Sequence, residues 1–415
     1  MGHGNVKLAE LRAFDAEAYC QRYPDIAQAV ASGELRDPWQ HYDRHGRMEG
    51  RALCAFDEEF YLRSYPRVAE EIGHGLAETP LQHYVLHGRA RGFVPNAKAV
   101  RPSNAALPAS EFGGLWVDDG DALDRIKGRL ETGQLTGRQA ELLEFFVVNG
   151  YVILPSAIEA PMIEAALADF DKAYMGGFEQ LKFEAPMVSR ENMAWRPEMM
   201  AVAAKALDIH HFSGAIRRLV FAPAIAEFLA LIFDNKALAS QSLGFLRGSA
   251  QESHQDSAYV TYTLPLKFAA SWVALEDVSI GAGELFYYPG SHRLPDFRYS
   301  GRYKSLSETE RMGGEKNEMH AEGRRHVKGL DELAKQFGLS KQVFAAKKGD
   351  VLIWHSDLIH GGHPVSQEIT RKSVVTHYCP KHVAPLFSET HRLTFHDHDG
   401  HVHTSSHYSG LPPLE

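Results

Sequence analysis

The spacing of apolar residues divides the chain into a helical first part and a strand-rich last part. Apolar residues recur at helical spacing over 161–174 and 221–233, and a charged segment over 121–130 predicts one more helix. Beyond residue 243 the pattern changes to short apolar runs and period-two alternation bounded by Gly, Pro and Ser. The expected strands are 243–246, 258–264, 269–275, 285–288, 351–354 and 373–378. Many short strands after a helical lead-in predict a double-sheet jelly roll, a mainly β domain with helices packed outside.

Residues 14–97 contain two copies of one 42-residue unit, at about 14–55 and 56–97. Thirteen residues of the first copy recur 42 positions later: Phe14, Asp15, Tyr19, Tyr23, Pro24, Ala27, Pro38, His41, Tyr42, His45, Gly46, Arg47 and Gly50. Each unit predicts three short helices, the third beginning at Pro38 or Pro80 and ending at a His-Gly pair. Helical units of fixed period bury their apolar faces against one another, so residues 1–97 are expected to form a small all-α tandem-repeat module.

Two histidine pairs in this module, His41/His45 and His83/His87, have an i,i+4 spacing that could bind zinc. Such a pair is only half of a tetrahedral site, so we favour the alternative that Tyr and His rings pack between the repeats at a helix end. The Tyr-Pro and His-Tyr units resemble modules of bacterial surface-carbohydrate enzymes. That resemblance implies a protein or carbohydrate partner for the module, with a role in stability as the default.

Composition and charge narrow the class of protein. With 44% hydrophobic residues, the 415-residue chain can bury a packed core. A net charge of −9 without long charged runs argues against nucleic acid or an anionic membrane surface as the main partner. No stretch approaches the roughly 20 apolar residues of a membrane span, and three scattered cysteines are too few for a disulfide framework. The N-terminus lacks a secretory pattern, so we expect a cytoplasmic protein without stable membrane insertion. The sequence gives no indication of oligomeric state.

The candidate chemistry begins at the stretch 253–257, where a histidine and a carboxylate lie two residues apart. On an extended strand, residues i and i+2 point to the same face. His254 and Asp256 can therefore reach one metal ion together, while Gln255 turns away.

A second stretch, 349–362, offers further histidines and is followed by Arg371. Two histidines and one carboxylate on one face of an octahedral ion leave three positions open, which is the geometry of non-haem Fe(II) oxygenases. An organic acid that chelates two of these positions needs its far carboxylate held, and the planar fork of arginine suits that task.

Ordered motifs from about residue 135 to 386 resemble those of the phytanoyl-CoA dioxygenase family. An entry pattern at 144–155 is similar to the family's opening helix and strand. The other motifs follow in the family's order and spacing: His254-Gln255-Asp256, 272–277, Gly283-Glu284-Leu285, 289–293, Gly349-Asp350, His360-Gly361-Gly362 and Arg371-Lys372-Ser373. The resemblance implies a cupin-like double-stranded β-helix that uses Fe(II), 2-oxoglutarate and O2.

The resemblance assigns His254, Asp256 and His360 as the iron ligands and catalytic residues. His360 is favoured as the third ligand because it stands eleven residues before Arg371 in the family's His-Gly context. Its rivals are His355, His363 and His377.

Four further residues are expected to bind the cosubstrate. The resemblance implies that Arg371 binds the far carboxylate of 2-oxoglutarate, and Ser373, two residues on along the same strand face, could donate a hydroxyl to it. Trp272 resembles a family position beside the cosubstrate, with an ordinary core tryptophan as the alternative. Gln255 also matches the family, although strand alternation would turn it away from the metal.

The implied function is a dioxygenase that hydroxylates an unactivated C–H bond of a small-molecule, lipid or carbohydrate-type metabolite and releases succinate and CO2. The resemblance implies that related halogenating enzymes lack the carboxylate found here at Asp256. The presence of Asp256 therefore favours hydroxylation over halogenation. One alternative is a cupin-like isomerase or hydrolase with different metal chemistry. Another is a non-catalytic binding protein that acts through the front repeats.

The expected domains are the repeat module at 1–97, a linker and lead-in helix at 98–134, the oxygenase domain at 135–390 and a His-rich tail at 391–415. The oxygenase domain carries an insertion at 294–348, which we expect to close over the substrate and to be helical over 330–337. Met and Trp residues between 183 and 200 could line an apolar pocket or fill the core. The tail is expected to be solvated and to bind metals weakly.

Overall fold

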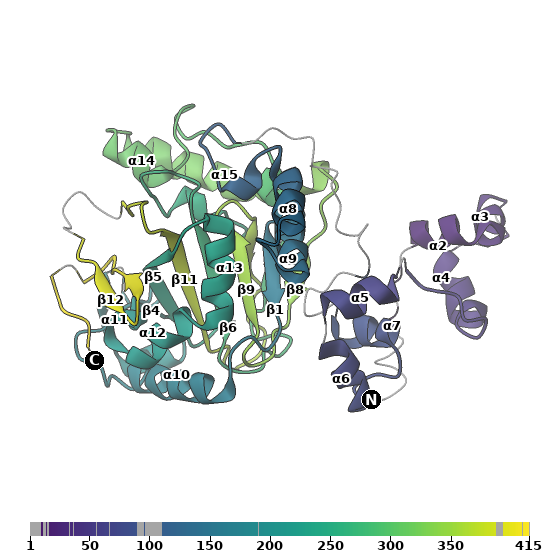
Figure 1. Cartoon of the computed structure of the whole chain (residues 1–415), viewed down its shortest axis with the longest axis horizontal. Helices are drawn as coiled ribbons and strands as arrows, with labels where there is room; N and C mark the ends of the chain where they lie inside the picture. The colour runs from purple at the N-terminus through teal and green to yellow at the C-terminus, as the bar shows by residue number, and fades with distance from the viewer. Residues whose placement is uncertain are drawn as a thin grey trace. The chain divides into compact units, whose positions relative to one another are not determined.

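The computed structural model describes residues 10, 14, 16–32, 34–35, 37–54, 56–65, 67–88, 95, 110–189, 191–386, 393–408 and 410–414. The chain forms two compact units, Met1–Arg101 and Pro102–Glu415 (Figure 1). The expected linker lies outside the described residues from 98 to 109. In the described part of the chain, every helix is too short or too polar to cross a membrane.

The first unit contains two helical repeats, as expected. The helices of the first copy are α2 (Ala16–Arg22), α3 (Pro24–Ala31) and α4 (Pro38–His41), and those of the second are α5 (Glu58–Ser64), α6 (Arg67–Gly73) and α7 (Pro80–His83). The third helix of each copy continues as a π-helical turn, η1 (Tyr42–Gly46) or η2 (Tyr84–Gly88), and so ends at the expected glycine. Asp15, Pro66, Arg89 and Gly92 of the repeat lie outside the described residues.

The aromatic and histidine rings pack within each copy, rather than between the copies as we expected. The Tyr19 hydroxyl lies 3.0 Å from His41 Nδ1, and Tyr61 repeats this contact with His83 at 3.0 Å. Gly46 makes the arrangement feasible, because a side chain there would collide with the Tyr19 hydroxyl. The repeated contact explains why Tyr and His recur at a constant offset, and it gives His41 and His83 a role in packing.

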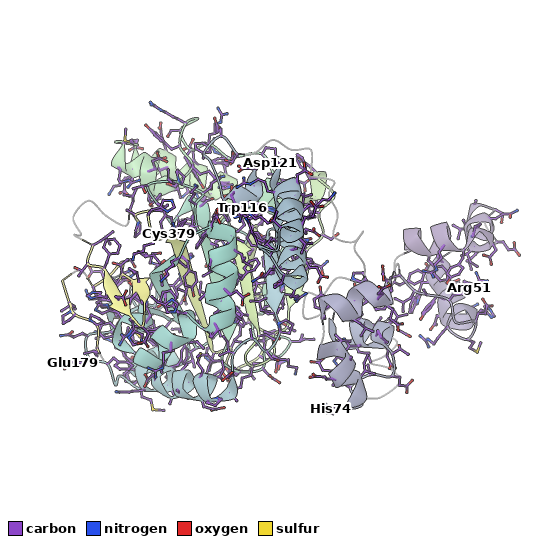
Figure 2. All side chains as sticks on the ribbon, in the orientation of Figure 1. Arg51, His74, Trp116, Asp121, Glu179 and Cys379 are labelled. Atoms are coloured by element: carbon purple, nitrogen blue, oxygen red, sulfur yellow. The ribbon has the colours of Figure 1, made fainter. Side chains whose placement is uncertain are left out.

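The second unit begins with helices that match the expected lead-in. Thr136 and Gln139 form a capping box at the start of α9, and Gly150 ends that helix at a φ of 73°. Trp116 lies near these helices, and its indole N–H donates a hydrogen bond of 2.8 Å to Leu231 O (Figure 2). The helices of the unit are η3 (Trp116–Asp118), α8 (Ala122–Glu131), α9 (Gly137–Asn149), α10 (Ala160–Ala173), η4 (Pro197–Met200), α11 (Ile209–Phe212), α12 (Gly214–Val220), α13 (Pro223–Phe233), η5 (Asp256–Ala258), η6 (Ser291–Arg293), α14 (Leu306–Arg311) and α15 (Lys316–Gln336).

Among the described residues, two β-sheets build the second unit, which confirms the expected mainly β jelly roll with flanking helices. The larger sheet runs in the order β1 (Tyr151–Leu154), β9 (Val351–His355), β6 (Ala269–Ala274), β11 (Ser373–Pro380), β5 (Ala237–Phe245), β4 (Lys205–Leu207), β2 (Lys182–Glu184) and β3 (Met193–Ala194), and its neighbours are antiparallel. The smaller antiparallel sheet runs β10 (His360–Gly362), β7 (Leu285–Tyr287) and β8 (Gln342–Phe344).

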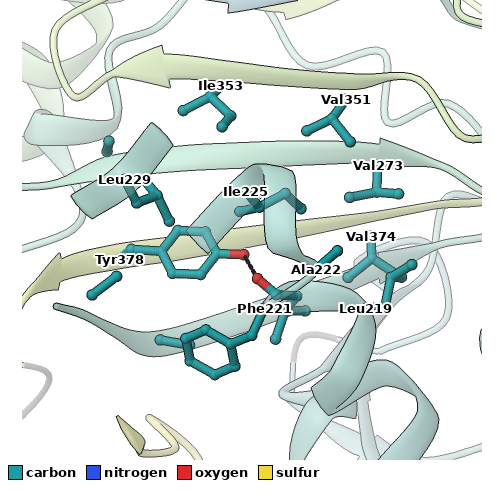
Figure 3. Packing of buried hydrophobic residues seen from close by; sticks show 14 of the residues in the cluster. Leu219, Phe221, Ala222, Ile225, Leu229, Val273, Val351, Ile353, Val374 and Tyr378 are labelled. Atoms are coloured by element: carbon teal, nitrogen blue, oxygen red, sulfur yellow. Dashed lines mark hydrogen bonds between the residues drawn. The ribbon is translucent and has the colours of Figure 1, made fainter. Parts of the chain in front are cut away.

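Successive side chains of each strand point to opposite faces of the larger sheet. One face packs against helices, and the other face borders a cavity. Figure 3 shows Val273, Ile353 and Val374 packed beneath α12 and α13, where the Tyr378 hydroxyl donates to Val220 O at 2.6 Å. Their chain neighbours Trp272, Trp354 and Val375 point to the other face of the sheet, where they line a cavity. Leu285 and His360 of the smaller sheet line the same cavity, which therefore lies between the two sheets.

One expected strand is absent, and one expected helix is confirmed but begins earlier than expected. Residues 258–264 do not form a strand, because the amides of Tyr259 and Val260 bond to Asp256 O at 2.9 and 2.8 Å and turn the chain. The helix expected at 330–337 is the end of the much longer α15. Asp331 lies inside that helix rather than near its N-cap.

The C-terminal His-rich tract is also not a solvated tail. It forms a hairpin of β12 (His396–His398) and β13 (His401–His403), and β13 pairs in parallel with β5 of the larger sheet. The buried carboxylate of Asp208 holds the chain after the hairpin by accepting from Ser405 Oγ at 2.7 Å and from Ser406 N at 2.8 Å. This long-range contact draws a polar tract against the sheet.

Candidate metal centre

Three buried side chains converge on one point at the edge of the cavity. His254 and His360 pair across an isolated antiparallel bridge, with backbone N···O distances of 2.9 and 3.0 Å. Asp256 opens the turn η5, and its Oδ1 lies 3.8 Å from His254 Nε2 and 3.6 Å from His360 Nε2. All ligand atoms of this trio lie within 4.8 Å of one another. The structure therefore brings together the three residues predicted from sequence.

Both imidazoles are set to present Nε2 to the same point. His254 Nδ1 lies 2.9 Å from Glu252 O, and His360 Nδ1 lies 2.9 Å from Leu358 O. A carbonyl only accepts, so each Nδ1 carries a proton and Nε2 is the nitrogen left to face a metal ion. Burial, reinforced by His360, lowers the pKa of His254 to about 3, so this imidazole is neutral at physiological pH.

The carboxylate of Asp256 is held on one side and open on the other. The Trp354 indole donates to Asp256 Oδ2 at 2.9 Å, and His377 Nε2 lies 3.3 Å from the same oxygen. Burial opposes ionisation of this carboxyl, but the imidazoles of His360 and His377 outweigh it and hold its pKa well below the usual range. Asp256 therefore stays ionised, with Oδ1 directed at the two histidines.

The donor set fits a divalent iron ion with open positions. Two imidazoles and one carboxylate form the ligand set of non-haem Fe(II) oxygenases. The trio lines a cavity of about 490 Å³, so one side of a bound ion would face space large enough for small molecules. A structural metal site would instead be closed by a fourth protein ligand.

The same cavity is lined by Arg371, a buried cation whose hydrogen-bond donors are only partly paired among the described residues. Arg371 donates one guanidinium N–H to Gly283 O, while its Nε has no hydrogen-bond partner among the described residues. Its guanidinium lies 5.7 Å from the Trp272 ring, and the Trp272 indole N–H and the Ser373 hydroxyl are likewise buried without partners there. Burial lowers the pKa of Arg371 to about 10, which leaves it charged at neutral pH. This corner suits a carboxylate.

Gln255 has a different environment from the one expected for a cosubstrate ligand. Its amide Nε2 donates to Asp357 O at 2.7 Å, and its Oε1 lies 3.2 Å from His326 Nε2. Gln255 is absent from the cavity lining, as is Ser373, although Ser373 begins the strand face that continues through Val375 into the cavity. Strand alternation gave the correct direction for Gln255.

The rival histidines do not join the trio. His355 points to the other side of β9, where its Nε2 lies 3.0 Å from Asp118 Oδ2. His363 packs its ring against Phe286 at 5.2 Å. His377 does line the cavity, but beside Asp256 Oδ2 rather than among the ligand atoms.

Sequence reasoning gave Trp354 no role and treated His377 only as a rival ligand, although both touch the carboxylate of Asp256. A signal existed for His377, because Ser373, Val375 and His377 alternate along one strand. For Trp354 the signal was weaker, since only the pairing of β6 with β9 shows which face of β9 it occupies.

Away from the metal ligands, the cavity lining mixes polar side chains with apolar ones such as Leu207, Leu243 and Phe245. Lys205 and Glu184 form an ion pair of 2.8 Å there. Other polar members of this part of the lining are Gln241, Ser249, Gln251, Tyr259 and His407. None of the methionines between 183 and 200 lines it: Met199 is buried in the core, whereas Met187 and Met200 are exposed. The alternative that these methionines form an apolar pocket has no support here.

The insertion at 294–348 does not cover the cavity. Among the described residues, none of its side chains belongs to the lining. Instead α15 packs behind the ligand-bearing segments, where Leu330 and Ala334 share a cluster with Ile359.

Comparison with known proteins places this site in a family. The chain is 24% identical over 276 residues to phytanoyl-CoA dioxygenase 1 of Oryza sativa subsp. japonica, covering 59% of this chain and 89% of the relative. Among solved structures, it resembles the non-haem α-ketoglutarate-dependent carbocyclase SnoK from nogalamycin biosynthesis (TM-score 0.44, 16% identity, 60% of this chain, 86% of the other). It also resembles EctD from S. alaskensis (TM-score 0.42, 17% identity, 59% and 77%). The sequence model of phytanoyl-CoA dioxygenase matches residues 146–373, more than half of the chain. The chain therefore belongs to the phytanoyl-CoA dioxygenase family of Fe(II)- and 2-oxoglutarate-dependent oxygenases.

Proposed function

We propose that this protein hydroxylates an unactivated C–H bond of a polar small-molecule metabolite, using Fe(II), 2-oxoglutarate and O2 and releasing succinate and CO2. One observation carries the proposal. The trio His254, Asp256 and His360 lines the same cavity as the buried, incompletely paired Arg371.

The side chains of the site have separate tasks. Nε2 of His254, Nε2 of His360 and Oδ1 of Asp256 would hold the iron. Bound there, Fe(II) supplies the activation of O2 coupled to the oxidative decarboxylation of 2-oxoglutarate. Arg371 binds the far carboxylate of 2-oxoglutarate through its planar fork.

Two further buried donors favour the same cosubstrate. The Trp272 indole and the Ser373 hydroxyl have no partners among the described residues, and an anion beside Arg371 would give them acceptors. The retained carboxylate of Asp256 favours hydroxylation, because halogenation requires that position for a halide.

The polar side chains within the mixed cavity lining support a substrate that makes hydrogen bonds. Lys205, Glu184 and Gln241 offer a cation, a carboxylate and an amide in one wall. Lys205 and Glu184 pair with each other and Gln241 donates to Ser406 Oγ at 3.0 Å, but all three are partly exposed, and an apolar chain laid over them would take their polar atoms out of water without adding a partner. A polyhydroxylated or zwitterionic metabolite therefore fits better than a long acyl chain.

The test is succinate formation from 2-oxoglutarate, with and without Fe(II), since this family turns over cosubstrate slowly even without its substrate. We expect iron-dependent succinate in the wild type and its loss in His254→Ala. Arg371→Lys keeps the charge but loses the fork, so it should raise the KM for 2-oxoglutarate about tenfold or more. Arg218→Ala removes an exposed arginine and should match the wild type.

The outcome separates oxygenase activity from other chemistry. Absence of succinate, together with absence of 2-oxoglutarate binding under anaerobic conditions, would overturn the proposal. If the wild type is active, the polar-substrate proposal is tested by adding polyols, zwitterions and acyl thioesters and measuring acceleration of succinate release. Acceleration by acyl thioesters alone would contradict the substrate class.

A further inference from the structure

We infer that the insertion at 294–348 braces the metal centre from behind, with His326, Asp331 and Lys304 as positioning residues for the iron ligands. The inference rests on the proposed function, because it assumes that His254, Asp256 and His360 bind iron. It replaces the expectation of a lid with a different task for the same segment.

His360 is held in β10 by its pairing with Tyr287 of β7, whereas the segment that carries His254 needs further support. His254 lies outside the named strands and joins β10 by a single isolated bridge. The direction of each imidazole depends on a backbone carbonyl two residues earlier, Glu252 O or Leu358 O. A shift of either segment would rotate its ring away from the common point.

A directed chain of hydrogen bonds runs from the insertion into both ligand segments. Gln255 donates from Nε2 to Asp357 O, which leaves its Oε1 as an acceptor. His326 must then donate from Nε2 to Gln255 Oε1, at 3.2 Å, and accept at Nδ1 from the Tyr299 hydroxyl, at 2.6 Å. Gln255 lies between His254 and Asp256, and Asp357 precedes His360 by three residues, so one amide couples both segments to the insertion.

The burial of His326 makes this chain well defined. Its ring stacks on Phe297 with centroids 4.4 Å apart and planes within 3°. Burial, with Lys304 nearby, lowers the pKa of His326 to about 4, so the neutral tautomer required by the chain is the one present at neutral pH.

Two further attachments from the insertion reach the same segments. Asp331 of α15 accepts a hydrogen bond from Ser253, the neighbour of His254, and another from Tyr288 at 3.0 Å. Lys304 is 4% exposed and bridges Asp357 at 2.7 Å and Asp296 at 2.6 Å. Removing Lys304 would leave the buried carboxylate of Asp357 without its charge partner, which would be costly.

Apolar packing completes the brace. Leu330 and Ala334 of α15 cluster with Ile359, the residue before His360. The insertion thus contacts residues next to both histidine ligands, yet contributes nothing to the cavity lining among the described residues. Apart from a hydrogen bond from Ser307 Oγ to Tyr259 O at 3.3 Å, these attachments reach the site through the ligand segments.

The test measures Fe(II) affinity of the full chain by anaerobic equilibrium dialysis. His326→Phe keeps an aromatic ring on Phe297 but removes the donor to Gln255, and we expect Fe(II) to bind about tenfold more weakly. His320→Phe makes the same change at an exposed position of the same helix and should leave the affinity unchanged. With iron at saturation, the KM for 2-oxoglutarate of His326→Phe should stay near the wild-type value.

A double-mutant cycle shows whether the effect passes through Gln255. Gln255→Leu should weaken Fe(II) binding by a similar factor, and the double variant should be no weaker than the worse single variant. If His326→Phe fails to fold, Ser253→Ala cuts the Asp331 attachment with little change in volume, and it should also weaken iron binding.

The outcomes distinguish the brace from the proposed function. A wild-type protein that binds no Fe(II) would overturn the proposed function itself. A wild-type protein that binds iron, with His326→Phe and Ser253→Ala binding it equally well, would overturn the brace alone. A lower melting temperature with unchanged iron affinity would likewise reduce the insertion to an ordinary stabilising element.

Discussion

At the scale of single residues, the metal centre depends on the atoms that hold the far side of each ligand. Asp256 illustrates this dependence, because the Trp354 indole fixes its Oδ2 and so directs Oδ1 at the histidines. An aspartate without that donor could rotate and offer both oxygens, which would change the coordination of the ion.

The role of Trp354 gives a testable prediction. Trp354→Phe keeps an aromatic ring in β9 but removes the hydrogen bond to Asp256, so we expect Fe(II) affinity to fall about tenfold while the protein stays folded. Anaerobic equilibrium dialysis gives the affinity, and circular dichroism gives the fold. Trp116→Phe is the matched control, because it removes an indole hydrogen bond to Leu231 O outside the cavity. Equal loss of iron in both variants would contradict the assigned role.

The difference between predicted and unpredicted residues has a physical cause. His254, Asp256 and Arg371 were visible in the sequence because a chelating site needs particular residue types at particular separations. Alternation along β11 indicated which face His377 occupies, but its contact with Asp256 and that of Trp354 depend on the pairing of β9, β6 and β11, which joins residues far apart in the chain.

At the scale of elements, local signals predicted boundaries well and long-range contacts overrode them elsewhere. The capping box of α9 and the glycine after it are sequence features, and the helix ends where they indicate. The His-rich hairpin has no apolar alternation that would predict a strand. Its attachment to the sheet depends on Asp208, whose partner Ser405 lies 197 residues away.

Asp208 therefore provides an element-scale prediction. Asp208→Ala removes the acceptor for the buried donors Ser242 N, Ser405 Oγ and Ser406 N, and each unpaired donor costs about 1–3 kcal/mol. We expect the free energy of unfolding to fall by about 3 kcal/mol or more, measured by denaturant titration. Asp397→Ala removes an exposed acceptor for Gly400 N within the same hairpin and should cost less than about 1 kcal/mol. Equal costs would show that the hairpin is not held through Asp208.

At the scale of the whole molecule, the order of segments was predictable but their mutual burial was not. Period-two runs after a helical lead-in indicated the jelly roll, and a constant offset indicated the repeats. The insertion between 294 and 348 was expected to close over the substrate because long loops on a rigid barrel often act as lids. Its packing depends on a few residues such as Leu330 and Ala334, which meet Ile359 only in the folded chain.

Buried histidines outside the metal centre should make the whole molecule sensitive to acid. Burial lowers the pKa of His211 and of His326 to about 4, compared with 6.5 for an ordinary histidine. Between pH 6.5 and about 4 the unfolded chain therefore binds protons that the folded chain does not, and stability must fall as the pH falls. The carboxylates with lowered pKa, such as Asp118 at about 2, affect stability only below this window.

His211 allows this prediction to be tested at one position. Its ring is stacked on Tyr408 with centroids 5.5 Å apart, and neither ring nitrogen has a hydrogen-bond partner among the described residues. His211→Phe should therefore keep the packing and remove one proton-binding group of the unfolded chain. In iron-free protein, we expect the melting temperature of the variant to fall less than that of the wild type between pH 7 and pH 5. His320→Phe, at an exposed histidine, should keep the wild-type slope, and identical slopes in all three proteins would mean that the buried imidazole of His211 does not control acid stability.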